Sequence, residues 1–121
     1  MATYMLLIYG NEQQWDAMTP EESESLEDGH RAFVAAVAAA GSAVLGSHPL
    51  EASVAATTLR GGPSGRPAVT DGPFLETAEA LGGYYVLEVP DRDAAVALAQ
   101  RLPELTMAHC AVEVRPVRDV G

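Results

Sequence analysis

The stretch Thr70-Asp-Gly-Pro-Phe-Leu-Glu-Thr-Ala-Glu-Ala-Leu-Gly-Gly-Tyr-Tyr85 joins a turn to an aromatic strand. An acid lies in a tight Gly-Pro turn, two more acids follow, and a double glycine precedes the tyrosines. Glycine, proline and aspartate each favour turns, so the chain should bend here and enter a strand over residues 84–89. Alternation places Tyr85, Leu87 and Val89 on one face of that strand and Tyr84 on the other.

A helix is predicted upstream, from Pro20 to Ala40. Thr19 and Glu22 have the spacing of a capping box, with proline at the first helical position, and Gly41 suits the helix end. Leu26, His30, Phe33 and Val37 follow one another at intervals of four, three and four residues, which puts them on one face. His30 therefore belongs to an otherwise apolar stripe.

The other segments follow from shorter patterns. Residues 4–9 are almost all apolar, which is typical of a strand buried on both faces, and residues 11–18 are expected to form a loop. Residues 53–59 and 67–70 flank the turn cluster 61–65 and predict a hairpin. A second helix should begin after Asp91 and end at Pro103, before a last strand over residues 111–117.

This order predicts one α+β domain spanning residues 1–121. It is the split βαβ, ferredoxin-like plan with an inserted hairpin, in which two helices cover one face of an antiparallel sheet. The second face carries Tyr84, Val86, Glu88, Glu113 and Arg115. A half-apolar open face favours burial against a second copy, so we expect a homodimer whose paired sheets form an α/β barrel.

Composition limits the classes of function. The formal net charge is −10, from 17 acids and 7 basic residues. A negative field disfavours direct binding to nucleic acid or to anionic membranes. The single cysteine and the missing basic leader at the N-terminus predict a cytoplasmic protein.

Five motifs together resemble the YCII-related proteins, and more narrowly the branch named for its Asp-Gly-Pro-Phe (DGPF) motif. They are the segments at residues 4–10, 70–74, 76–79, 81–85 and 112–117. The resemblance covers nearly the whole chain and implies a bacterial, cytoplasmic, dimeric α/β barrel, often of unknown function. The family usually has lysine where this chain has Ala78 and glycine where it has Cys110.

The same resemblance bears on function. Some genes of this branch neighbour those of extracytoplasmic-function sigma factors, and a few relatives in the wider family are cofactor-free lyases that use a histidine and an aspartate. His30 matches the place of that histidine on the first helix, and Asp71 is the motif aspartate. The resemblance therefore implies His30 and Asp71 as catalytic candidates.

Each candidate also has a purely structural explanation. Imidazole titrates near neutrality and suits proton transfer, but His30 can equally be a packed helix residue. Asp71 can orient that histidine or stabilise its own turn. Arg115, Glu113, Tyr84 and Glu76 are the substrate-binding candidates, with Arg115 as an anchor for a carboxylate or enolate. The alternatives are a Glu113–Arg115 ion pair and, for Glu76, a solvated loop acid.

Two functions remain open from the sequence. One is a cofactor-free lyase or isomerase that acts on a small organic molecule by acid–base catalysis. The other is a non-catalytic ligand-binding or regulatory protein linked to a sigma factor, for which the acidic segment 12–28 would meet a basic partner. No pair of His or Cys has metal-ligand spacing, so we expect neither a metal nor a cofactor.

Overall fold

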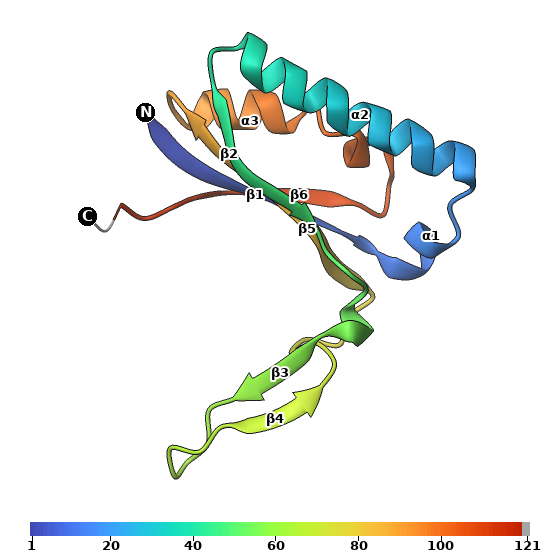
Figure 1. The fold of residues 1–121 in the computed structure, drawn as a ribbon, viewed down its shortest axis with the longest axis vertical. Helices are drawn as coiled ribbons and strands as arrows, with labels where there is room; N and C mark the ends of the chain where they lie inside the picture. Colours follow the sequence, from blue (N-terminus) through green and yellow to red (C-terminus); the bar gives the residue numbers. More distant parts are fainter. Residues whose placement is uncertain (120–121) are drawn as a thin grey trace.

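A four-stranded antiparallel sheet forms the centre of the computed structural model, which describes residues 1–119. Its strands are β1 (Ala2–Asn11), β2 (Ala43–Pro49), β5 (Glu79–Val89) and β6 (Ala111–Pro116), in the order β2-β5-β1-β6. Helices α2 (Pro20–Ala39) and α3 (Arg92–Ala99) lie on one side of this sheet, as Figure 1 shows. The α+β, ferredoxin-like prediction is confirmed.

Both long helices begin where their sequence signals place them. The Thr19 side chain accepts a hydrogen bond from the Glu22 backbone N–H at 3.1 Å, and the Glu22 carboxylate accepts one from the Thr19 N–H at 3.0 Å. The Asp91 carboxylate caps α3 by accepting from the Ala94 N–H at 2.8 Å. Gly41 follows the end of α2 with a φ of 76°, a left-handed conformation that favours glycine.

The core lies between the helices and one face of the sheet. The predicted stripe of α2 supplies Phe33 and Val37, both 1% exposed, and β5 supplies Tyr85, Leu87 and Val89. β1 alternates instead of being buried on both faces as predicted, because Leu6 and Ile8 are buried while their neighbours are only half-buried. The opposite face of the sheet has no helix over it (Figure 1).

Residues 11–18 are not the predicted loop, because a short helix, α1 (Glu12–Asp16), follows β1 directly. The Asn11 side chain caps it by accepting from the Gln14 N–H at 3.2 Å. Asn11 is a good N-cap residue, and its side chain starts a helix in a stretch whose polar composition favoured a loop. The helix brings Trp15 back onto the sheet, where its ring contacts Gly10 and Gly82.

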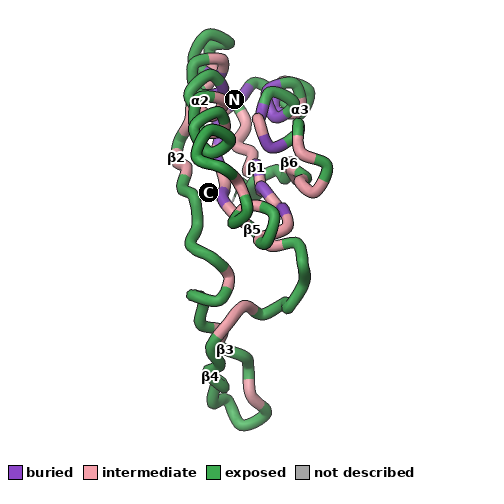
Figure 2. The backbone as a smooth tube through the Cα atoms, turned by 90° about the vertical axis from the view of Figure 1, so that its right-hand side faces the viewer, coloured by how far each residue is buried: buried purple, intermediate pink, exposed green. Residues whose placement is uncertain are grey.

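The predicted hairpin is present but begins later than expected. Residues Ser53–Ala55 form a turn of 3-10 helix, η1, and the strands are β3 (Thr57–Arg60) and β4 (Ala68–Asp71). They pair only with each other and extend away from the main sheet as an exposed arm (Figure 2). A second 3-10 turn, η2 (Pro103–Thr106), follows α3 and leads to β6.

The double glycine lies inside β5 and does not precede it, since the strand already begins at Glu79. The register with β1 shifts at this point: Ile8 faces Gly83 and Tyr9 faces Leu81, so that Gly82 has no partner residue. This irregularity is a β-bulge, and glycine is common at bulges. The Trp15 ring fills the space that a side chain at position 82 would need.

We predict that Gly82→Ala destabilises the fold by about 1–3 kcal/mol, the usual effect of overpacking a fitted site. A Cβ at position 82 would lie 2.6 Å from the Trp15 ring, too close for any real contact. Urea unfolding followed by circular dichroism measures the change. Gly46→Ala in β2 is the control, because nothing lies within 4 Å of a Cβ there. Equal unfolding midpoints for the two variants would contradict the close Trp15 contact.

Candidate functional site

A pocket of about 630 Å³ opens beside the central sheet. Its walls come from α1, from the N-terminal half of α2, from residues 47–52 at the end of β2 and after it, and from residues 82–85 of β5. Glu104 of η2 also lines it. A volume of this size accommodates a small organic molecule.

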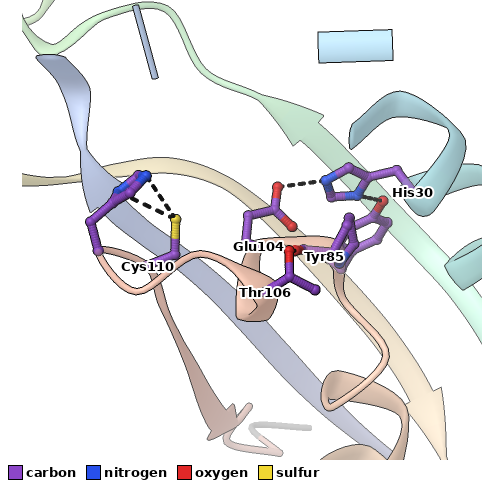
Figure 3. A network of polar contacts seen from close by, with 7 residues as sticks. His30, Tyr85, Glu104, Thr106 and Cys110 are labelled. Atoms are coloured by element: carbon purple, nitrogen blue, oxygen red, sulfur yellow. Dashed lines mark hydrogen bonds and ion pairs between the residues drawn. The ribbon is translucent and has the colours of Figure 1, made fainter. Parts of the chain in front are cut away.

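His30, Tyr85 and Glu104 form a polar network in the wall of this pocket (Figure 3). His30 Nε2 lies 2.6 Å from Glu104 Oε2, and His30 Nδ1 lies 2.7 Å from the Tyr85 hydroxyl. The His30 side chain is 26% exposed and that of Glu104 is 6% exposed. Both ring nitrogens of the histidine are therefore engaged, one by a carboxylate and one by a phenol.

Packing explains why these three side chains meet. Helix α2 approaches η2 very closely, because a Cβ at Gly29 would lie 2.5 Å from the Pro103 side chain. This approach brings His30 and Glu104, the next residue in each segment, within hydrogen-bond distance. The Tyr85 ring packs between the rings of His30 and Phe33, with centroid separations of 5.8 Å and 4.7 Å.

The proton positions follow from the partners. An ionised carboxylate only accepts hydrogen bonds, so His30 donates its Nε2–H to Glu104. In the neutral imidazole Nδ1 then accepts the hydrogen bond that the Tyr85 hydroxyl donates. Burial, and secondarily the negative charge of Glu104, raise the pKa of Tyr85 above its ordinary value, so its hydroxyl keeps the proton at neutral pH.

The second oxygen of the Glu104 carboxylate has no such partner. Oε1 is buried and accepts no hydrogen bond from any side chain or backbone group among residues 1–119. A buried acceptor without a donor destabilises a fold by about 1–3 kcal/mol. Glu104 therefore retains an unused hydrogen-bonding capacity at the pocket.

A further carboxylate joins two walls of the pocket. Glu12, at the start of α1, accepts hydrogen bonds from the Ser53 hydroxyl and from the Ser53 backbone N–H, the latter at 2.7 Å. These two bonds hold the pKa of Glu12 below its ordinary value, so Glu12 is ionised at neutral pH. The contact fixes the segment that follows β2 against α1.

The predicted site residues separate into three places. Of the substrate-binding candidates, Tyr84 lines the pocket together with His30. Asp71 and Glu76 instead line a second hollow beside the hairpin, which Ser53 also borders. In this chain, the carboxylate that contacts His30 is Glu104 and not Asp71. The segment containing Glu76 and Glu79 is not helical, so these acids do not share a helix face.

Glu113 and Arg115 lie away from the pocket, on β6. Their side chains form an ion pair on the face of the sheet that no helix covers. This matches the structural explanation that the sequence left open for the two residues. Exposed ion pairs of this kind contribute little to stability.

Cys110 and His109 lie close together just before β6, which begins at Ala111. Cys110 Sγ lies 3.5 Å from His109 Nδ1. Burial, and then the charge of Glu104, raise the pKa of the Cys110 thiol, which disfavours the reactive thiolate. Among residues 1–119, no three His, Cys, Asp or Glu side chains are grouped to hold a metal ion.

Sequence reasoning missed Tyr85 and Glu104 as members of the site. Tyr85 was placed correctly on the core face, where a buried phenol needs a hydrogen-bond partner, and His30 was the polar residue of the facing stripe. That pairing could have been derived. Glu104 gave a weaker signal, an acid between Pro103 and Leu105, because the 3-10 turn that orients it was not predicted.

The comparisons with known proteins agree with this architecture. Residues 2–120 match the YCII-related domain. An uncharacterized protein of Rhizobium meliloti (strain 1021) is 34% identical over 115 residues, which cover 94% of this chain and 90% of that protein. None of the helices within residues 1–119 is long and apolar enough to cross a membrane. The chain belongs to the YCII-related family.

Proposed function

We propose that this protein is a homodimeric, cofactor-free lyase or isomerase that moves protons on a small organic molecule. The observation that carries the proposal is the position of His30 between Glu104 and Tyr85 in the wall of a pocket. A histidine held by a carboxylate has a fixed tautomer and a stabilised imidazolium form, which are the properties of an acid–base group. Glu104 takes the role of the carboxylate partner that the resemblance assigns to Asp71.

His30 acts through its neighbours in this proposal. Both of its ring nitrogens already have partners at 2.6 and 2.7 Å, so we assign the contact with the bound molecule to the Tyr85 hydroxyl. When the phenol oxygen takes a proton from a C–H bond of the bound molecule, the hydroxyl proton passes to His30 Nδ1. The resulting imidazolium lies against the ionised Glu104. Reversal of the two transfers returns a proton to the substrate at another atom or at a leaving group.

The raised pKa of Tyr85 is compatible with this relay. A free tyrosinate would be unfavourable beside Glu104 in a buried site. The two transfers occur together, so the phenol gains one proton as it loses another and no tyrosinate forms. His30 is thus a positioning and relay residue, and Tyr85 is the catalytic residue that touches the substrate.

We also propose that the protein forms a homodimer and that it belongs to the DGPF branch of the YCII-related family. The face of the sheet without helices presents Met5 and Leu7 of β1 beside Val86 and Tyr84 of β5, and all four are half-buried in the single chain. Closing this face against a second copy gives the dimeric α/β barrel. The Asp-Gly-Pro-Phe sequence at residues 71–74 supports membership of the DGPF branch, and a single cysteine supports a cytoplasmic location.

Proton transfer is testable by hydrogen exchange on carbon. We expect the protein to accelerate exchange of the α-protons of at least one small cyclic ketone into D2O, followed by proton NMR. His30→Gln should slow this exchange by about a hundredfold or more, the range of general acid–base catalysis.

His109→Gln is the matched control for this experiment. His109 is not a lining residue of the pocket, and its Nδ1 accepts a hydrogen bond from the Asn11 N–H. We expect this variant to retain the exchange rate. Unchanged exchange in His30→Gln would contradict the relay, and no exchange with any ketone of the panel would favour the non-catalytic, ligand-binding role.

The Tyr85 environment predicts a pH dependence of stability. Its pKa is raised in the folded protein, so above its ordinary value of 10.0 the unfolded chain loses the proton first. The stabilising contribution of the protonated phenol is therefore present below that pH and is lost as the pH rises through the folded pKa. Unfolding midpoints measured between neutral and strongly alkaline pH should fall less steeply for Tyr85→Phe than for the wild type. Equal slopes for the wild type and Tyr85→Phe would contradict the assignment. Tyr4→Phe is the control, because it also removes one phenol from the protein.

The dimer has its own test. We predict that Val86→Glu, which places a charge in the middle of the open sheet face, gives a monomer in size-exclusion chromatography with light scattering. Val34→Glu introduces the same charge on α2, where Val34 is 43% exposed, and should leave the dimer intact. A dimer that survives Val86→Glu would show that the subunits pair through another surface.

A further inference from the structure

The pocket has a strongly acidic lining. Five carboxylates border it, those of Glu12, Asp16, Glu27, Glu51 and Glu104. The one guanidinium in the lining, Arg31, forms an ion pair with Asp28 and is therefore partly neutralised. An anion would enter against this field, whereas a cation would be attracted, and the formal net charge of −10 acts in the same direction.

Glu104 adds a specific point of attachment within this acidic lining. Its side chain is 6% exposed, its Oε2 is bonded to His30, and its Oε1 accepts no hydrogen bond from the residues that the structure describes. A buried carboxylate oxygen without a donor is unfavourable, and an N–H group of a ligand would satisfy it. This oxygen is buried in a residue that lines the pocket, so an N–H group of a ligand would have to reach into the pocket wall to meet it.

An aromatic ring completes the chemistry of the site. Trp15 lines the pocket and is only partly buried. Its face can pack against an apolar ligand body, and aromatic faces also attract cationic groups. The lining thus combines an apolar surface with negative charge.

We propose that the pocket binds a small organic cation, an apolar body with a primary ammonium or amidinium group whose N–H donates to Glu104 Oε1. This deepens the proposed function, because it names the class of substrate for the same site. The cation lies beside the His30–Glu104 pair, and a C–H bond next to it meets the Tyr85 hydroxyl. Carboxylate substrates, which the sequence associated with Arg115, are excluded by the acidic lining, and Arg115 lies outside the pocket.

The fluorescence of Trp15 reports whether a ligand occupies the pocket, because Trp15 is the single tryptophan of the sequence and lines the pocket. Three pairs of probes share a body and differ in charge: benzylammonium and benzoate, phenethylammonium and phenylacetate, and cyclohexylmethylammonium and cyclohexanecarboxylate. We expect each ammonium probe that binds to do so about tenfold or more tightly than its carboxylate partner, as measured by quenching of Trp15 fluorescence and by calorimetry. Raising the salt concentration should weaken the binding.

Glu104→Gln should weaken ammonium binding by about tenfold or more, the effect of losing a charged hydrogen bond. Glu24→Gln makes the same charge change on the exposed surface of α2, outside the pocket, and should bind as the wild type does. The selectivity of the wild-type protein within each pair is a test that does not depend on the folding of either variant.

Carboxylate probes that bind as tightly as their ammonium partners would overturn the inference, as would the absence of binding by all three ammonium ions. Unchanged ammonium affinity in a folded Glu104→Gln variant would also overturn it. These probes need no turnover, so the outcome is separate from that of carbon-proton exchange. If carboxylates bind better while His30-dependent exchange persists, the ligand class is wrong and the acid–base proposal stands.

Discussion

The close approach of helix α2 to the turn η2 is the constraint on which the site depends. Gly29 has no side chain, and the space that a Cβ would occupy is filled by the Pro103 ring. Helix α3 ends at Ala99 and not at Pro103 as predicted, and Pro103 instead begins η2, the turn from which Glu104 points inward. Two backbone properties, the absence of a Cβ and a fixed φ, therefore bring a histidine and a carboxylate together from positions 74 residues apart.

The network that results is unusual for a small core because it buries an acid. A carboxylate that is 6% exposed in such a place is tolerated only when it is hydrogen-bonded, and His30 satisfies one of its oxygens. Tyr85 then uses the other nitrogen of the ring, so that the phenol, imidazole and carboxylate are oriented by one another. This order of phenol, imidazole and carboxylate matters chemically, because a charge that develops at one end of the hydrogen-bonded series is compensated at the other end.

The sequence predicted most of the fold, because the signals that decide it are local. Capping residues, apolar periodicity and turn clusters located the starts of both long helices and the strands β1, β3, β4 and β6 to within a few residues, whereas β5 begins earlier than predicted. The stripe on α2 correctly placed His30 on the helix face that turns toward the core. The site was predicted only in part, because it depends on contacts between distant segments. Nothing near Glu104 in the chain indicates that it turns toward His30, and nothing near Asp71 indicates that its hairpin extends away from the body.

The exposed arm formed by β3 and β4 has a consequence for how such a protein can change over evolutionary time. The two strands pair with each other and not with the four-stranded sheet, and the arm is joined to the body at η1 and at the start of β5 (Figures 1 and 2). Insertions and deletions are tolerated best in exposed connections of this kind. The arm can therefore lengthen, shorten or acquire new surface residues while His30, Tyr85 and Glu104 keep their positions, so that the chemistry and the contacts of the protein can diversify separately.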